Sequence, residues 1–418
     1  MLKKTFLAVV LLAVGIYVGF SLPRGAGLIS TIMSLNSQGS EDYSLSASHQ
    51  AFLELQELIS STREMVLSDA RTQQEANEGM RMMLRALAMS TEVVADTNPL
   101  LPHFQRMDTL ARKVGGDNPD AEYEFAQIDG HLDYRITGNL GNIRYLGFTI
   151  NAGKGMTPRR QAAYISDRML DADENGNFTI LLAQEKPDEP GNWVQIPADA
   201  SGILVREYIA DRQAETLPTL KIEVIGDVPP FTPPSDQQIA NSIIGTTYAF
   251  FRLTTLHRSV LPRLLDEQND FIRATAEELG GAISGADNLY MIGSYQIADD
   301  EALIVEVQPP ESRYWNLTLE NRWHEVGDYL HRPTSRTLED VEYGEDGSVQ
   351  FVISHKDPGH PNWLDTSGHG FGFMTFRWVD GNIDDIAMPT TRLVKTAEIE
   401  AGSRQKTRSP FSGNGGHE

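Results

Sequence analysis

The spacing of hydrophobic residues changes along the chain, and these changes outline the fold. Apolar residues recur every three or four positions in residues 49–118 and 235–284, which predicts helical segments. In residues 119–230 and 285–400, short β-branched and aromatic runs alternate with Gly, Pro and Asx turns, which predicts strands. We therefore expect an α+β fold that is mainly β, with two related antiparallel β-sandwich lobes, each preceded by a helix pair.

Sequence signals mark the expected helices within each pair. Capping boxes at Thr72 to Glu75 and Ser235 to Gln238 predict two helix starts. Helical spacing predicts a first helix through Phe52, Leu55, Ile59, Met65 and Val66, and a second with the buried stripe Met80, Met83, Leu84, Leu87 and Val94. The Met-rich stripe fits either ordinary core or a docking surface. In the second pair, the expected helices contain Ile239, Ile243, Phe250 and Leu253, then Leu264, Leu265, Phe271, Ile272 and Leu279.

The first residues indicate export. Residues 5–22 form an uncharged, largely apolar run behind Lys3 and Lys4, so residues 1–24 are predicted to be a signal anchor or a cleaved signal peptide. The positive flank would stay cytoplasmic, which places the rest of the chain on the periplasmic side of an inner membrane. Residues 25–48 have the composition of a tether, and residues 401–418 that of a disordered tail.

A duplication relates the two β-rich segments. Asp173 to Glu207 and Glu345 to Trp378 share an Asx-Gly turn, an apolar strand, a Lys, a Pro-rich loop, an Asn-Trp pair and an Arg in a later strand. The corresponding positions lie 169 to 171 residues apart, as in Arg144 and Arg313 or Asn192 and Asn362. Residues kept in both copies are expected to serve the fold, and we interpret Asn-Trp as a structural corner.

Residues present in the second copy alone are candidates for a site. His355, His360 and His369 have no counterpart in the first copy, and Trp315, Trp323 and Trp378 also lie in the second. A His near a carboxylate is the usual arrangement of a general base, so the candidate catalytic residues are His369 and His360 with Asp365 as the orienting group. The candidate ligand-binding residues are Trp363, Trp315, Trp378, Arg313 and Arg377.

Composition and motifs exclude several classes of function. A net charge of -23 argues against nucleic acid as a partner, since binding to phosphates needs clustered Lys and Arg. The chain has no cysteine, which excludes disulfides and thiolate chemistry. The stretch Asp171 to Gly176 begins like a calcium loop, but Leu182 stands where a bidentate Glu is required. We predict no metal site and no cofactor.

The last quarter of the chain resembles a known family. Arg313 to Leu319, Asp346-Gly347, Asn362-Trp363-Leu364 and Phe376-Arg377 resemble the bacterial family catalogued as domain of unknown function 1214. Its members have an aromatic-Trp strand, Asp-Gly-Ser, Asn-Trp-Leu-Pro and a final Leu-Arg-aromatic stretch; here Asp365 to His369 replaces the Pro-containing loop. The resemblance implies a jelly-roll-like β-sandwich and frequent export, and it implies no established reaction.

Three functions from different classes therefore remain open. The first is binding of a sugar-like or other organic ligand by the second β-sandwich, and the second is a hydrolase with the His/Asp site. The third is an envelope scaffold that holds a protein partner through the Met-bearing N-terminal helices. In each case the expected location is the inner membrane, with an anchor at residues 5–22, or the periplasm if the signal is cleaved.

Overall fold

The structure is a computed structural model that describes residues 43–399 except 110, 114, 155, 156, 158, 231, 260, 261, 267, 275–287 and 381–385. The predicted anchor at residues 5–22 and the predicted tail at 401–418 lie outside these residues, as does nearly all of the tether. Within the part that is described, no helix combines the length and the apolar character needed to cross a bilayer.

The first lobe is a sandwich of two sheets. Its five-stranded sheet has the order β1-β2-β8-β4-β5, and its four-stranded sheet has the order β7-β6-β3-β9. The two inner faces bury one cluster of mainly aliphatic residues, which includes Ile136, Phe148 and Ile203. The strands are β1 (Gln105–Arg106), β2 (Ala121–Gln127), β3 (Tyr134–Asn139), β4 (Tyr145–Ala152), β5 (Arg160–Ser166), β6 (Asn177–Ala183), β7 (Asn192–Gln195), β8 (Ala200–Tyr208) and β9 (Thr219–Val224).

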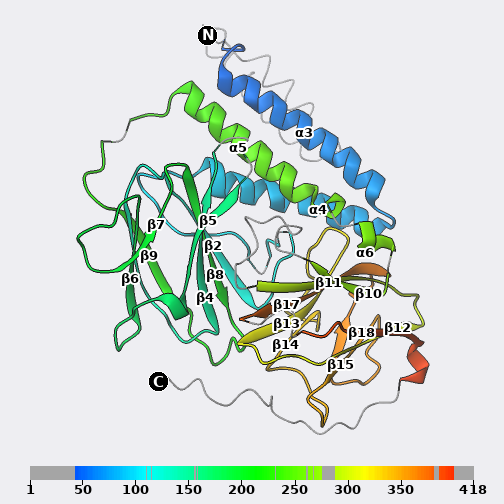
Figure 1. Ribbon diagram of the computed structural model, residues 1–418. Coiled ribbons are helices and arrows are strands. Elements are labelled where there is room, and N and C mark those ends of the chain that lie inside the picture. The colour runs from blue at the N-terminus through cyan, green and yellow to red at the C-terminus, as the bar shows by residue number, and fades with distance from the viewer. Residues whose placement is uncertain are drawn as a thin grey trace, which may run out of the picture.

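The second lobe repeats this topology strand by strand (Figure 1). Its sheets have the orders β10-β11-β17-β13-β14 and β16-β15-β12-β18, which match those of the first lobe position for position. The strands are β10 (Asp270–Ala274), β11 (Asn288–Gln296), β12 (Glu301–Val307), β13 (Tyr314–Glu320), β14 (Ser335–Thr337), β15 (Val349–Ser354), β16 (Trp363–Asp365), β17 (Phe371–Val379) and β18 (Thr390–Lys395). The prediction of two related, mainly β lobes is confirmed.

The expectation of purely antiparallel sheets needs one correction in each lobe. Strands β6 and β7 pair in parallel, and so do their counterparts β15 and β16. The Pro-rich loop carries the chain back to the beginning of the preceding strand, so the short strand after Asn-Trp runs in the same direction. The duplication itself pointed to this shared loop, but strand direction was not visible in the hydrophobic pattern.

The Asn-Trp pair forms a corner of the same geometry in both lobes. Asn192 accepts a hydrogen bond from Asp171 N and donates to the carbonyls of Asp171 and Thr179 at 2.8–3.1 Å. Asn362 makes the equivalent three bonds to Glu342 N, Glu342 O and Gln350 O at 2.7–3.0 Å. The indole nitrogens of Trp193 and Trp363 donate to backbone carbonyls at 3.3 and 3.2 Å. The interpretation of Asn-Trp as a structural corner is confirmed.

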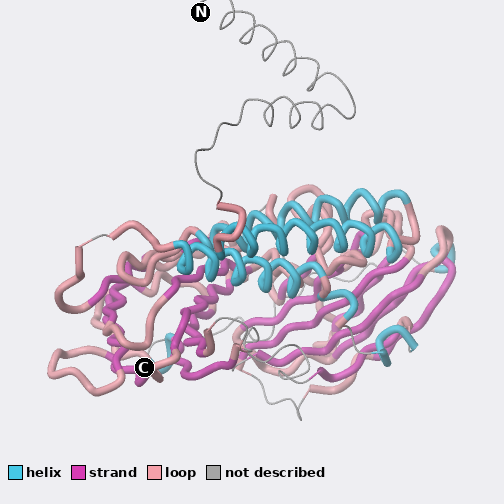
Figure 2. The backbone as a smooth tube through the Cα atoms, turned by 90° about the horizontal axis from the view of Figure 1, so that it is seen from above, coloured by secondary structure: helices cyan, strands magenta, loops and turns pink. Residues whose placement is uncertain are grey.

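Three long helices form one layer over the lobes (Figures 1 and 2). They are α3 (Ala47–Asp69), α4 (Gln73–Ser90), which continues into a π-helical turn η1 (Thr91–Ala95), and α5 (Asp236–Thr254). Thr72 and Ser235 cap α4 and α5 as predicted. Met82, Met83 and Met89 are buried, which supports a core role for the Met-rich stripe, but Leu84 is 71% exposed because the buried face of α4 is rotated from the predicted one.

The second predicted helix pair is wrong in its latter half. In the described part of the chain, α5 is followed by a 3-10 turn and the short α6 (Pro262–Asp266), and Phe271 and Ile272 lie in strand β10, which pairs with β11. The predicted helix residue Leu279 lies outside the described residues. Short 3-10 turns are η2 (Asp167–Met169), η3 (Leu256–Arg258) and η5 (Thr396–Glu398). Two adjacent apolar residues fit a helix face and a buried strand equally well, and pairing with β11 decides for the strand.

Equivalent arginines join the two lobes. Arg144 of the first lobe forms an ion pair with Glu339 of the second at 2.5 Å, while Arg313 of the second lobe pairs with Asp167 of the first. Between them, the rings of Tyr208 and Tyr314 stack across the interface at 5.0 Å. The duplication thus provides reciprocal contacts, and the lobes pack as one body.

The corner asparagines generate a stability prediction. Replacing Asn362, which is 1% exposed, with Ala leaves buried backbone groups without partners, and we expect a loss of about 2–3 kcal/mol in the free energy of unfolding. Urea denaturation measures it. Asn241→Ala on the exposed face of α5 serves as the control and should change stability by less than about 0.5 kcal/mol. Equal losses for the two variants would contradict the corner role.

Candidate functional site

A cavity of about 390 Å³ lies between the helix layer and the second lobe. Four parts of the chain form its walls: helix α4, the segment that holds Lys113, the connection between β13 and β14, and the loop between β16 and β17. Strand β11 contributes Tyr295 from below the loop. The predicted residues Asp365 and His369 both line this cavity, so the second copy does contribute a site-like arrangement.

Helix α4 presents one charged face to the cavity. Glu78, Arg81 and Arg85 stand three and four positions apart, which places them on one side of a helix. Arg85 pairs with Glu325 at 2.8 Å, and Arg81 has no ion pair or side-chain hydrogen bond with any other described residue. Sequence reasoning missed these residues, and their only signal was the charged spacing, which equally fits a solvated helix face.

The buried imidazole of His369 meets a carboxylate from α4. His369 is 7% exposed, and its Nε2 lies 3.1 Å from Oε1 of Glu78. An ionised carboxylate can only accept, so Nε2 is the donor in this contact, and the side-chain nitrogen of Gln74 lies 3.0 Å from the same Nε2. Burial raises the pKa of Glu78, but the hydrogen bond and charge of His369 outweigh it, and the pKa lies below its ordinary value. The partner of His369 is therefore Glu78 and not the predicted Asp365.

Asp365 has other partners. Its Oδ2 accepts from Nη1 of Arg332 at 2.7 Å, and its Oδ1 accepts from the backbone N of Ser367 at 2.8 Å. The third predicted catalytic residue, His360, does not line the cavity; its Nδ1 accepts from the backbone N of Asn362 at 3.1 Å. Among the three predicted catalytic side chains, the structure brings only His369 and Asp365 to one cavity, each with a partner of its own.

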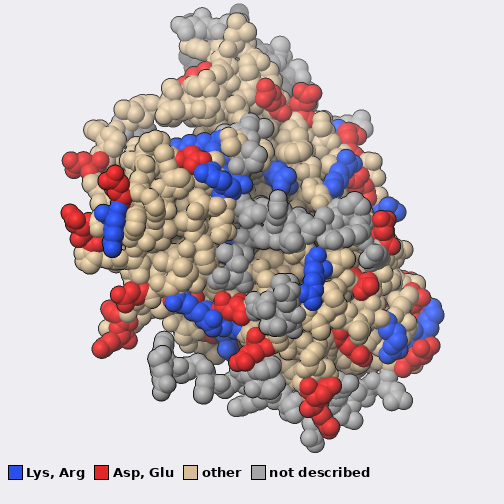
Figure 3. All heavy atoms as spheres, viewed as in Figure 1, with Lys and Arg blue, Asp and Glu red and all other residues tan. Residues whose placement is uncertain are grey.

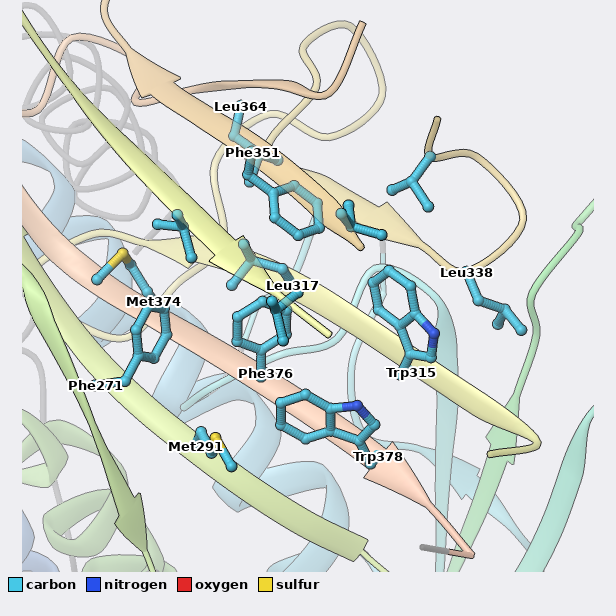
Figure 4. Close-up of a cluster of buried hydrophobic side chains, with 14 of the residues drawn as sticks. Phe271, Met291, Trp315, Leu317, Leu338, Phe351, Leu364, Met374, Phe376 and Trp378 are labelled. Carbon is cyan, nitrogen blue, oxygen red and sulfur yellow. The ribbon is translucent and has the colours of Figure 1, made fainter. Parts of the chain in front are cut away.

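The predicted ligand-binding tryptophans are not gathered in a cleft. Trp315 and Trp378 are 1% and 0% exposed, and they point into the core of the second lobe among Leu317, Phe351 and Phe376 (Figure 4). Trp315 lies on β13 and Trp378 opposite it on β17. Trp363 is half-buried in the corner. The enrichment of Trp in the second copy therefore reflects a larger core, since indoles bury the most apolar surface per residue.

The two predicted ligand-binding arginines are engaged in the scaffold. Arg313 is held between Asp167 and Asp380 at the lobe interface. Arg377 is 4% exposed and donates to Thr318 Oγ1 at 2.8 Å, as its counterpart Arg206 donates to Thr149 Oγ1 at 2.7 Å. Because this bond is present in both copies, we interpret Arg377 as a residue that stabilises the sheet. Arg377 also forms an ion pair with Glu320.

Hydroxyl groups of the cavity wall have spare hydrogen-bonding capacity. Tyr295 lines the cavity, and its hydroxyl makes no hydrogen bond with the described residues. Thr334 Oγ1 and Ser367 Oγ are buried and likewise have no partner there. Buried polar groups in native proteins nearly always find a partner in protein, water or ligand. No set of three or more His, Cys, Asp or Glu within the described ranges could hold a metal ion.

Lys113, Asp117 and Glu325 are buried charged residues beside the cavity. The Lys113 ammonium donates to the carbonyls of Val326 and Gly327 and lies 4.4 Å from the ring centre of Tyr329. Burial lowers the pKa of Lys113, against the opposing charges of Asp117 and Glu325. Burial likewise raises the pKa of Glu325 despite the ion pair with Arg85. These groups hold the connection between β13 and β14 in place.

Comparison with known proteins finds one family model that matches a segment of each lobe. Residues 121–212 and 298–381 match the model of the family described as Protein of unknown function (DUF1214), so the likeness that the sequence indicated in the last quarter alone extends to both lobes. The two matched segments contain β2 to β8 and β12 to β17. None of the curated proteins matches the chain significantly.

One solved structure shares the fold of most of the chain. The chain is similar to an uncharacterised protein from Burkholderia cenocepacia, with 27% identity and a TM-score of 0.79, over 84% of this chain and 98% of that one. The VPA0106 protein from Vibrio parahaemolyticus is 12% identical, with a TM-score of 0.47, over 75% of this chain and 96% of that one. The first likeness covers the lobes and the helix layer together, and its description names no activity.

The pair of His369 and Glu78 generates a pH-dependent prediction. A carboxyl group whose pKa is lower in the folded state stabilises the protein above its ordinary pKa of 4.5, and this contribution disappears as the pH falls through the lowered value. We expect Glu78→Gln to cost about 1 kcal/mol of unfolding free energy at pH 7. The cost should shrink toward zero in urea titrations below the lowered pKa. A pH-independent difference would show that Glu78 acts through packing alone.

Proposed function

We propose that the protein binds a small polar organic molecule of the sugar-like class in the cavity between α4 and the second lobe. The observation that carries this proposal is the cavity itself: about 390 Å³, within the size range of ligand sites, with hydroxyl, amide and charged groups from separate elements converging on it. The duplicated core has no need of these groups, since the first lobe folds without the corresponding His and Asp.

Hydrogen bonds rather than stacking would hold such a ligand. Trp315 and Trp378 are in the core, and the aromatic side chains at the cavity are Tyr295 and Tyr329, the latter already in contact with the Lys113 ammonium. The hydroxyls of Tyr295, Thr334 and Ser367 are complementary to the hydroxyls of a sugar, because each can donate and accept. A half-open cavity with mixed polar walls supports reversible binding of a solute.

Calorimetric titration of the full chain with glucose, N-acetylglucosamine and maltose tests the proposal. We expect Tyr295→Phe, which removes only the cavity hydroxyl, to weaken the binding of a responsive sugar about 3- to 10-fold. Tyr343→Phe is the matched control, because its hydroxyl donates to Leu338 O in the core, outside the cavity, and affinity should not change. Equal affinities of the wild type and Tyr295→Phe would argue against this cavity.

One observation supports a second candidate, a hydrolase. His369 and Glu78 form an imidazole and carboxylate pair at a cavity wall, and such a pair can act as a general base in which Nδ1 takes the proton while Nε2 donates to the carboxylate. This arrangement replaces the predicted His/Asp pair.

An envelope protein partner and the membrane location are also still predictions, and the exposed Leu84 and Phe52 on the helix layer are compatible with a partner.

The hydrolase candidate makes a distinct prediction. If His369 acts as a base, the protein should release nitrophenol from p-nitrophenyl esters or glycosides, and His369→Gln should lower the rate about 100-fold or more. His355→Gln is the control, because this histidine bonds to Thr366 and does not line the cavity. Absence of turnover across the panel, or equal rates in the two variants, would leave ligand binding as the function of the site.

A further inference from the structure

We propose that the ligand of this cavity carries an anionic group, a carboxylate or a phosphate, which the arginines Arg81, Arg85 and Arg332 recognise; the inference rests on the proposed function. Hydrogen-bond donors and acceptors around the cavity are used to different extents. If the acceptor groups of a site already have partners and its donor groups do not, the site is complementary to a ligand that supplies hydrogen-bond acceptors.

The carboxylates of the cavity wall are all engaged. Glu78 accepts from His369, Gln74 and Asn321 at 3.0–3.1 Å. Glu320 accepts from His324 at 2.9 Å and from Thr375 at 2.8 Å. Asp328 lies 2.9 and 3.0 Å from the imidazole of His331. The remaining two, Glu325 and Asp365, are paired with Arg85 and Arg332. Each of the five thus already has at least one donor or cation of the protein as a partner.

The guanidinium groups, in contrast, have donors to spare. Each guanidinium has five N–H bonds. Arg85 uses Nη1 toward Glu325 and Arg332 uses Nη1 toward Asp365, and no described residue accepts from their other nitrogens. Arg81 has no described partner at all and is exposed on the cavity face of α4. Three partly unused guanidiniums at one cavity form a site for planar, bidentate recognition of an anion.

A second cavity continues this arrangement. It measures about 410 Å³, adjoins the first, and shares Tyr329, Leu330 and Arg332 with it. Its other arginines are Arg212, which is bonded to Glu122 and Pro119 O, and Arg336, which makes only long contacts of 3.4 Å. The carboxylates of Asp120 and Asp340 also line this second cavity. Over the rest of the visible face, basic and acidic side chains are interspersed (Figure 3). In a chain of net charge -23, arginines on the walls of two adjoining cavities mark where an anion is accommodated.

The same sugar ring with different substituents tests the inference. Full-length protein is titrated with glucose, glucuronate and glucose 6-phosphate at constant ionic strength. We expect at least one acid to bind about 10-fold more tightly than glucose, since a hydrogen bond to a charged group is stronger than a neutral one. A gain with glucuronate alone identifies a carboxylate site, and a gain with glucose 6-phosphate alone identifies a phosphate site.

Two variants locate the effect. Arg81→Gln removes a cation without breaking any described contact, so it should reduce the preference for the acid about 5- to 10-fold and leave glucose affinity nearly unchanged. Arg252→Gln, an exposed arginine of α5 outside both cavities, should keep the full preference. The assignment to Arg81 would be overturned if both variants kept the preference for the acid, or if both lost it.

The outcomes separate this inference from the proposed function. Equal affinities for glucose and the two acids would overturn the anionic ligand and leave the sugar-like site standing. No binding of any of the three, with no thermal stabilisation by inorganic phosphate, would overturn both. Binding of the acids with a preference that Arg81→Gln abolishes would support both.

Discussion

The position of the helix layer depends on the contact between Trp323 and Gly79. The Trp323 indole is 2% exposed, lies in the helix core with Val66 and Phe250, and donates from Nε1 to Glu75 O at 2.8 Å. A Cβ atom on Gly79 would lie 2.8 Å from Trp323 Cζ2 and even closer to Val66, so a larger residue would push the second lobe away. Gly79 immediately follows Glu78, and the close approach it permits brings that carboxylate to His369. The site exists because a glycine lets helix and lobe meet.

Duplication explains where the site lies. The strands and corners are shared, but one connection in the larger sheet differs in length. Residues 153–159 join β4 to β5, whereas residues 321–334 join the equivalent strands β13 and β14. The longer connection carries Trp323, which docks the helices, and Arg332, which lines both cavities. One lengthened loop thus creates the interface and a wall of the site together, while the first lobe keeps the unmodified fold.

The sequence was informative where one copy could be compared with the other. The repeated Asn-Trp pair and the repeated Arg made the corner and the sheet scaffold predictable before their hydrogen bonds were known. The comparison also selected His369 and Asp365, which do line the cavity. It failed for Trp315 and Trp378, because a larger core and a ligand-binding site both enrich a sequence in Trp. It could not find Glu78, which lies 291 residues before His369 on a helix whose charges resemble an ordinary solvated face.

The charge of the whole chain and the charge of the cavity act over different distances. A net charge of -23 repels anions from afar, but at physiological ionic strength this field is screened beyond about 8 Å. Inside the cavity, guanidinium groups meet a ligand at hydrogen-bond distance, where the lower local dielectric strengthens each contact. An anion would therefore approach without electrostatic steering and be retained by short-range contacts. Selectivity would then lie in the dissociation rate, and it would depend on the few arginines whose donors the fold has left unused.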